Sequence, residues 1–376
     1  MTNEKKGKQE EYKRANEYVE SVYQENPPPY SEEELDGIFA QVRQLAPNVK
    51  LDRSWLERMI EILSRRKPEC HVRPRANEEW EHIFPRYPIS PEDGFSKSFA
   101  PDQVSDIRDT LSKFGLVVVR VFSKETCQAT IAAMFEEINS MESTTRKEYL
   151  HPEIHDTWKN CNWPNGAKKF LVPRPAFHLQ AFANRVDQNI YSVFSNLWQE
   201  HRLRVSIDNW GVTRGSTSLL LNDYDGLPQR VDKPRWGKGI SPHWDYNPWL
   251  FVREVEQGRN PGYQGVVALN DHVPGMGCHR TLPGGKPFLR QWTLEHGCPE
   301  GMTERKRQSY RPKENDPILQ YMQEIPLRRG DLLIWSWGQL HATANNESDT
   351  MRLHQYMRMF PAPEADPFYE LLDHHE

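Results

Sequence analysis

The order of segments along the chain predicts an α+β fold, with a β-sandwich or barrel core flanked by helices. Segments with helical periodicity dominate up to residue 202, and short apolar segments separated by turn clusters follow. Helices first and strands afterwards favour segregated layers over alternating β-α units. The 12 Trp residues and the 11% aromatic content indicate an ordered core, because disordered chains are poor in aromatic residues.

Helices are predicted where apolar residues recur at helical spacing. The highly charged residues 1–26 either form a solvent-exposed helix or stay disordered. Ser31 and the three glutamates after it start a second helix, because a serine cap and an acidic first turn stabilise a helix N-terminus. Further helices are expected at 51–66, 103–113, 123–141 and 187–202.

Strands are predicted from short β-branched or alternating runs that end at Gly, Pro or Asn clusters. The first is the apolar run Gly115–Val119, which reads as a buried strand. The others are expected at Leu203–Val212, Ser218–Asn222, Ser241–Asp245, Gly265–Leu269, Leu332–Trp337 and Arg352–Met359.

Composition and charge argue against several kinds of partner. The 48 basic and 53 acidic residues give a net charge of −5, and basic residues gather only in short clusters, so we predict no nucleic-acid partner. Five cysteines without a C-x-x-C pair argue against a disulfide framework or a zinc ribbon. No apolar run reaches the ~18 residues of a spanning helix, so we predict no membrane segment. A reducing, cytoplasmic setting is expected.

One short motif suggests a protein partner. Pro27-Pro28-Pro29-Tyr30 fits the Pro-Pro-x-Tyr pattern that WW domains bind as a polyproline II helix. The same prolines also fit a simple loop that breaks a helix. Both interpretations stay open, and a WW-domain ligand would be a weak one.

Two separate segments predict a metal centre. His243 and Asp245 form a His-x-Asp pair, and alternate residues of a strand point to the same face. Alone this pair is weak evidence in a chain with 14 histidines. A later segment, Arg329–His341, leads from an Arg-Gly-Asp turn through a buried strand to His341. Two histidines and one carboxylate form the facial triad of non-haem Fe(II) oxygenases, so His243, Asp245 and His341 are predicted to bind Fe(II).

Arg352 and Thr343 are candidate ligands of 2-oxoglutarate. Thr343 lies two residues after His341, and the polar turn 345–349 returns the chain so that Arg352 lies beside His341. A facial triad leaves positions open for the keto-acid end of 2-oxoglutarate and for O2. The far carboxylate then needs a cation, and a planar guanidinium pairs with a carboxylate bidentately. The Thr343 hydroxyl can add a hydrogen bond.

Residues from about 103 to 361 resemble the phytanoyl-CoA dioxygenase family of Fe(II)/2-oxoglutarate oxygenases. The likeness is carried by the entry segment Lys113–Val119, the turn Val273–Lys286, the His243-x-Asp245 pair, and Arg329-Gly330-Asp331 through His341, Thr343 and Arg352. The resemblance implies a double-stranded β-helix, that is, a jelly-roll or cupin-like core. It also implies hydroxylation of an unactivated C–H, or desaturation or cyclisation, with release of succinate and CO2.

The resemblance also sets the expected domain organisation. Residues 101–363 would form the dioxygenase domain, with residues 287–324 as an insertion near the mouth of the site. Residues 1–100 would be a helical, Pro-rich N-terminal extension, and residues 364–376 a C-terminal tail.

Two positions depart from the family pattern, and the resemblance predicts where several other side chains lie. Gly285 and Lys286 replace the usual Ser and His of the turn, which leaves the substrate open. Trp244 is expected to point away from the iron into the sheet. By resemblance to the ectoine hydroxylase branch, Trp249 lies beside iron and substrate, although a core aromatic fits as well. The family's halogenases lack the carboxylate, so Asp245 favours oxidation.

Three further histidines lie in the region of predicted strands. His354 shares a strand face with Arg352 and can line the pocket. His272 and His279 are expected in turns or at the surface.

The substrate is expected to be a small molecule or a carrier-linked acyl group. One alternative is a protein hydroxylase of the same class, whose polypeptide substrate the N-terminal extension presents. Another is a jelly-roll binding protein without catalysis, which the complete set of ligands disfavours. A zinc hydrolase would have no use for Arg352.

Overall fold

The computed structural model describes residues 3–25, 30–65, 84–167, 171–222, 226–299 and 309–363. The chain divides into two compact units, Met1–Arg73 with Gln291–Gly301, and Pro74–Arg290 with Met302–Glu376. The first boundary therefore lies inside the extension 1–100 that the sequence predicts. Pro27, Pro28 and Pro29 lie outside the described residues, so the WW-ligand hypothesis stays a prediction.

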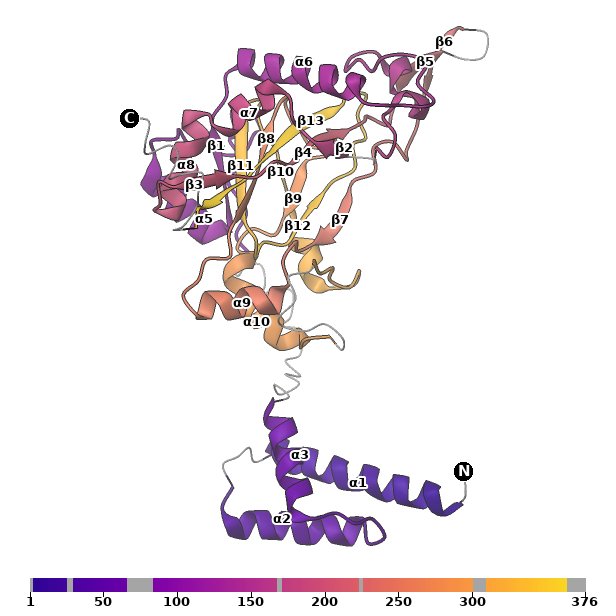
Figure 1. Ribbon diagram of the computed structural model, residues 1–376, viewed down its shortest axis with the longest axis vertical. Helices are drawn as coiled ribbons and strands as arrows, with labels where there is room; N and C mark the ends of the chain where they lie inside the picture. The colour runs from indigo at the N-terminus through magenta and orange to yellow at the C-terminus, as the bar shows by residue number, and fades with distance from the viewer. Residues whose placement is uncertain are drawn as a thin grey trace. The chain divides into compact units, whose positions relative to one another are not determined.

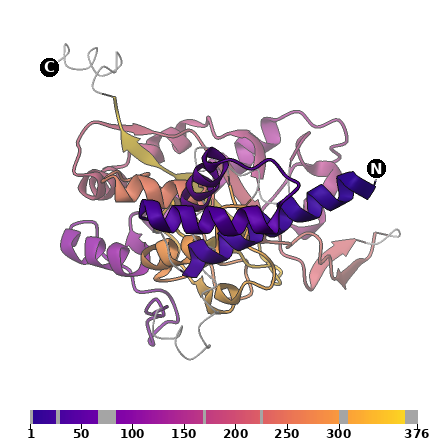
Figure 2. The ribbon, with the colours of Figure 1, turned by 90° about the horizontal axis from the view of Figure 1, so that it is seen from below.

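In the described part of Met1–Arg73, the first unit contains the helices α1 (Asn3–Glu25), α2 (Glu32–Leu45) and α3 (Arg53–Arg65), drawn in indigo in Figure 2. Helix α2 begins with a reciprocal cap, in which the Ser31 hydroxyl accepts from the Glu34 amide and the Glu34 carboxylate accepts from the Ser31 amide. The helices bury one apolar cluster, Ala15, Val19, Ile38, Val42, Ala46, Trp55 and Leu56. Apolar packing of this kind explains why the charged N-terminal segment is helical.

The second unit contains two larger antiparallel sheets (Figure 1). One has the strand order β1 (Leu116–Arg120), β11 (Asp331–Ser336), β8 (Tyr263–Ala268), β13 (Arg352–Met357), β4 (Asn209–Thr213) and β2 (Leu171–Pro175). The other has the order β10 (Gln323–Ile325), β9 (His279–Thr281), β12 (His341–Thr343) and β7 (Ile240–His243). The predicted combination of helices and antiparallel sheet is confirmed.

Two short pairs complete the strands, β3 (Leu203–Val205) with β14 (Met359–Pro361), and β5 (Leu219–Asn222) with β6 (Pro228–Val231). The predicted strands Leu203–Val212 and Arg352–Met359 were each wrong in one respect, because each is broken into two strands that pair with different partners. Within the predicted insertion 287–324, the described residues include the end of helix α10 (Gly285–His296), a 3-10 helix η3 (Pro317–Tyr321) and the beginning of β10.

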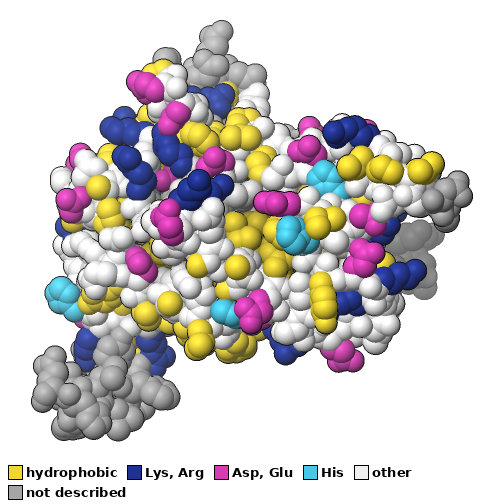
Figure 3. All heavy atoms as spheres, turned by 90° about the horizontal axis from the view of Figure 1, so that it is seen from above, with side chains coloured by type: hydrophobic (Ala, Val, Ile, Leu, Met, Phe, Trp, Pro, Cys, Tyr) yellow, Lys and Arg dark blue, Asp and Glu magenta, His cyan; other side chains and the backbone are white. Residues whose placement is uncertain are grey.

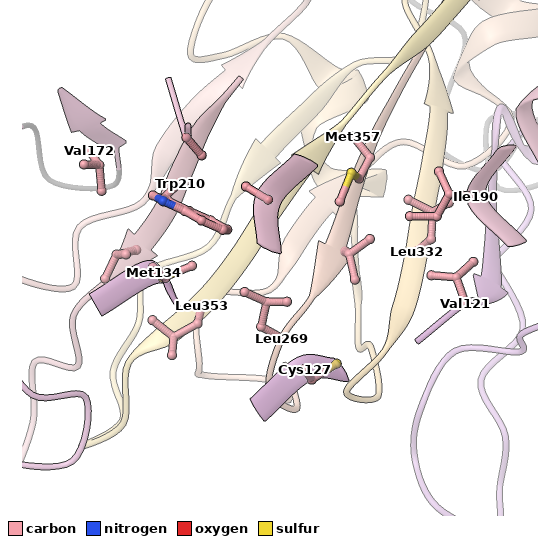
Figure 4. Close-up of a cluster of buried hydrophobic side chains, with 14 of the residues drawn as sticks. Val121, Cys127, Met134, Val172, Ile190, Trp210, Leu269, Leu332, Leu353 and Met357 are labelled. Carbon is pink, nitrogen blue, oxygen red and sulfur yellow. The ribbon is translucent and has the colours of Figure 1, made fainter. Parts of the chain in front are cut away.

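Helices α5 (Val104–Phe114), α6 (Lys124–Ser140), α7 (Leu179–Arg185) and α8 (Gln188–Trp198) contribute to the main core on one face of the six-stranded sheet. Cys127 and Met134 of α6 and Ile190 of α8 gather there with side chains of the strands (Figure 4). Because side chains alternate along a strand, Leu353 and Met357 of β13 face this core. Arg352, His354 and Tyr356 are left for the opposite face.

The surface carries mixed charges. On the face drawn in Figure 3, acidic and basic side chains are interspersed with apolar ones. Among the described residues, no helix combines the length and the apolar composition that crossing a membrane requires.

Asp331, at the start of β11, gives the fold a specific pH dependence. Burial raises the pKa of this carboxyl from 3.8 to about 7, although Arg328 opposes the shift. The folded state therefore binds this proton more tightly than the unfolded state, and the stability that Asp331 contributes is lost as pH rises from about 4 to about 7. We expect Asp331→Asn, which can still accept the hydrogen bond from the Arg328 amide, to gain about 1–3 kcal/mol over the wild type at pH 8.

Urea unfolding curves of the wild type and Asp331→Asn at pH 5 and pH 8 would measure this effect. The two proteins should differ more at pH 8 than at pH 5. Parallel pH dependences of the two unfolding free energies would contradict the assignment to Asp331.

Candidate metal centre

The predicted metal ligands come together because β7 pairs with β12. His341 lies directly opposite His243 in the antiparallel register, and their ring centroids are 4.4 Å apart. Directly opposite residues of such a pair point to the same face of the sheet. Asp245 lies two residues beyond His243, so its side chain reaches the same face.

The three side chains converge on one point. One ligating atom from each of His243, Asp245 and His341 lies within 4.8 Å of the other two. The Nε2 atoms of His243 and His341 lie 3.2 and 3.6 Å from the two carboxylate oxygens of Asp245. Among the described residues, this is the one group of three or more His, Cys, Asp or Glu side chains that lie close enough together to hold a metal ion.

Backbone carbonyls set which nitrogen of each histidine is available. Nδ1 of His243 lies 2.9 Å from the carbonyl oxygen of Ser241, and Nδ1 of His341 lies 3.0 Å from that of Gln339. A carbonyl accepts but cannot donate, so each Nδ1 carries the proton in the neutral ring and each Nε2 keeps its lone pair. Such partners orient metal-binding histidines. The residues present therefore fit a divalent cation.

The third ligand is an ionised carboxylate. Burial acts to raise the pKa of Asp245. The rings of His243 and His341 outweigh burial when their Nε2 atoms carry a proton in place of a metal, and they then hold the pKa well below its usual range. The side-chain amide of Gln264, on β8, donates to the second carboxylate oxygen at 2.7 Å. The side chain of Asp245 is 43% exposed, so one side of the centre stays accessible to ligands.

A cavity of about 490 Å3 opens at the centre. Its described lining comes from both sheets and from a loop: Asp208, Asn209, Ile240, His243, Asp245, Gln264, Gly265, Val266, His279, Ser309, Arg311, Trp335, His341, Thr343, Arg352, His354, Tyr356 and Arg358. This volume lies within the range of ordinary small-ligand sites. The predicted triad, Thr343, Arg352 and His354 therefore share one cavity.

Arg352 is held in this cavity by His272. The Arg352 Nε donates to Nδ1 of His272 at 3.4 Å, and Nε2 of His272 lies 3.1 Å from the carbonyl oxygen of Leu353. Burial, with the neighbouring Arg352, lowers the pKa of His272 well below its usual value, so the ring is neutral and can accept from the guanidinium. The expectation that His272 lies in a turn or at the surface was wrong, because the residue is fully buried.

His279 was also wrongly expected in a turn or at the surface. It is buried on the short strand β9, which pairs with β12. Its ring stacks nearly parallel on that of His341, with centroids 5.7 Å apart, and lies 4.6 Å from Trp335. His279 therefore supports the ring of a candidate metal ligand from the side.

The two tryptophans near the His-x-Asp pair pack away from the cavity lining. Trp244 is buried, and its backbone pairs with that of Tyr310. Trp249 is buried at the start of α9 (Pro248–Glu256), edge-on to Tyr310 at 5.1 Å. Among the described residues that line the cavity, Trp249 is absent. Its predicted place beside iron and substrate stays a prediction.

The fold and the site together define a candidate 2-His-1-carboxylate centre between antiparallel sheets. No protein-family model matches the chain. A curated protein of Dictyostelium discoideum named "Putative phytanoyl-CoA dioxygenase" is 24% identical over 334 residues, which cover 75% of this chain and 88% of that protein. The resemblance to the phytanoyl-CoA dioxygenase family that the motifs predict is confirmed.

Solved structures are similar at low identity. The epimerase SnoN in complex with Fe3+, alpha ketoglutarate and nogalamycin RO has 16% identity over 71% of this chain and 89% of that chain, with a TM-score of 0.42. EvdO2 from Micromonospora carbonacea var. aurantiaca has 16% identity over 70% of this chain and 93% of that chain, with a TM-score of 0.42. The hypothetical protein JW0805 from Escherichia coli has 11% identity over 93% of this chain and 82% of that chain, with a TM-score of 0.46.

Proposed function

We propose that this protein is an Fe(II)- and 2-oxoglutarate-dependent oxygenase in which His243, Asp245 and His341 bind the iron. The observation that carries the proposal is the convergence of two Nε2 atoms and one ionised carboxylate, with both Nδ1 atoms occupied by backbone carbonyls. We also propose that the two antiparallel sheets are the halves of a double-stranded β-helix formed by the predicted domain 101–363. Their facing surfaces would enclose the cavity.

Arg352 would bind the far carboxylate of 2-oxoglutarate, with Thr343 adding a hydroxyl. Arg352 is fully buried, and burial lowers its pKa from the ordinary value of 12.5, yet its Nε has a neutral partner in His272. No other hydrogen bond joins this guanidinium to a described residue, so its two Nη atoms can pair with an anion as a fork. Bound iron, 2-oxoglutarate and O2 would supply the oxidation of a substrate C–H, with release of succinate and CO2.

The substrate would be a small molecule or a carrier-linked acyl group that is hydroxylated, desaturated or cyclised. The name of the Dictyostelium relative supports the carrier-linked class. The cavity volume of about 490 Å3 suits the reacting part of either class. Trp249 would border the substrate only if its side chain turned from Tyr310 toward the cavity. A protein hydroxylase remains the second candidate, with residues 1–100 presenting the polypeptide.

The decisive measurement is anaerobic binding of Fe(II) and 2-oxoglutarate, followed by visible absorption. Iron chelated by 2-oxoglutarate has a weak charge-transfer band, and we expect this band in the wild type. His341→Ala should lose it, because a metal ligand is gone. Arg352→Ala should still bind iron but should need at least about tenfold more 2-oxoglutarate, because a charge-assisted pair is lost.

Asn222→Ala, at the end of the β5–β6 hairpin and outside the cavity lining, is a suitable control and should behave as the wild type. A folded wild type without the band, or one that binds no iron, would replace the oxygenase by a binding protein without catalysis.

A further inference from the structure

A second cavity, of about 700 Å3, lies apart from the lining of the metal centre. Its described lining shares no residue with the first cavity: Asn160, Trp163, Pro164, Gly166, Ala167, Arg214, Asp232, Lys233, Pro234, Arg235 and Trp236. Three stretches of chain form it, namely 160–167, the residue that follows β4, and 232–236. The last stretch leads within a few residues into β7, which bears His243.

Arg214 is the buried polar group of this cavity. Its side chain is fixed between two indoles, with the guanidinium carbon 4.2 Å from the ring centroid of Trp236 and 5.4 Å from that of Trp163. Nη1 donates to the carbonyl oxygen of Trp158 at 2.6 Å and to Oδ1 of Asn160 at 2.9 Å. The residue is 8% exposed, and both hydrogen bonds that it forms with described residues come from this one nitrogen. The other donors of the fork are left for a ligand.

The charge of Arg214 is not compensated by the protein. Burial lowers the pKa of its guanidinium to about 10, so the group is still a cation at neutral pH. Among the described Asp and Glu residues, none forms an ion pair with Arg214, and its two acceptors are neutral. The two neutral acceptors would be enough if Arg214 only stabilised the fold. In that case, however, its buried charge would have no counter-ion, which costs free energy.

The rim of the cavity adds further positive charge. Lys233 and Arg235 are exposed there. Among the described lining residues, Asp232 is the only one with a carboxylate. One oxygen of Asp232 already accepts from the amide of Ser218 at 2.8 Å. Three cations against one partly engaged carboxylate make the cavity attractive to anions.

We propose that this cavity binds the oxyanion of a small molecule, a phosphate or a carboxylate, through Arg214. The guanidinium offers a planar fork that matches either group bidentately. The flanking indoles of Trp163 and Trp236 fix the fork in place and give the rest of the ligand an apolar wall. Lys233 and Arg235 attract the anion from solvent.

Isothermal titration of the metal-free full-length protein with inorganic pyrophosphate and, separately, with malonate tests the proposal. At least one probe should bind, and the tighter one identifies the class of oxyanion. Arg214→Gln should bind it at least about tenfold more weakly, because a charge-assisted fork is lost. The double variant Lys233→Gln/Arg235→Gln changes exposed residues only, so it keeps the fold; it should bind severalfold more weakly and depend less on salt.

Arg120→Gln, exposed on β1 and outside both linings, is the matched control and should bind as the wild type does. Malonate bound at Arg352 instead would be unaffected by Arg214→Gln. Absence of binding by both probes, or equal affinities of the wild type, Arg214→Gln and the rim variant, would overturn the proposal. Because no metal is present, neither result depends on the iron assignment.

Discussion

Replacing Asp245 with Ala should lower the affinity for Fe(II) by more than about 100-fold and abolish turnover. Changing a residue that only orients a metal ligand already lowers metal affinity or activity by about 10–100-fold. Asp245 would itself supply the anionic oxygen that binds the metal. Without it, the Nε2 atoms of His243 and His341 would hold the cation alone. Anaerobic Fe(II) titration, read by the absorption band with 2-oxoglutarate, measures the loss.

Two other variants separate ligation from general cavity charge. Asp208→Asn also removes a carboxylate from the cavity lining, but Asp208 faces Arg358 at 3.3 Å, so iron binding should survive. Gln264→Leu removes the amide that orients Asp245 and should give an intermediate loss of about 10–100-fold. Equal iron affinities of Asp245→Ala and Asp208→Asn would show that Asp245 is not a ligand.

The triad could be predicted from sequence because its geometry follows from local rules. The His-x-Asp spacing predicts that His243 and Asp245 reach one face, although β7 ends at His243. This rule acts over a few residues, so the printed sequence contains it. The expectation that the turn 345–349 sets Arg352 beside the strand of His341 was wrong, because β12 and β13 lie in different sheets, and the two residues share only the cavity. The structure adds the register that sets His341 opposite His243.

The residues that support the triad could not be predicted in the same way. His272 and His279 lie in a stretch rich in Gly and Pro, which favours turns. Their burial comes from contacts with β12 and β13, far along the chain. Gln264 contacts Asp245 only after β8 takes its place in the sheet. No local pattern encodes such distant partners.

Short elements were missed for a related reason. Strands β9, β10 and β12 have three residues each, too few for alternation to be recognised. Their pairing with neighbouring strands stabilises them. The cavity around Arg214 could likewise not be predicted from the sequence. Only the fold brings Arg214 together with Trp163 and Trp236.

Gly239→Ala should damage both the fold and the metal centre, although residue 239 is not a ligand. A Cβ at this position would lie 2.0 Å from the carbonyl oxygen of Thr343 and 2.5 Å from that of Ala344. These are backbone atoms of β12 and its end, so they cannot move aside as a flexible side chain would. Gly239 comes directly before β7, and Thr343 pairs with Ile240 in that strand.

The substitution would therefore push β7 away from β12 and separate His243 from His341. We expect a loss of about 1–3 kcal/mol in unfolding free energy, as for other overpacked sites, and at least about tenfold weaker Fe(II) binding because ligand geometry is disturbed. Gly37→Ala is the matched control, since nothing lies within 4 Å of its added Cβ and alanine is favoured inside a helix. It should leave the iron titration unchanged. Wild-type stability and iron affinity in Gly239→Ala would mean that the contact between these two strands does not hold the centre together.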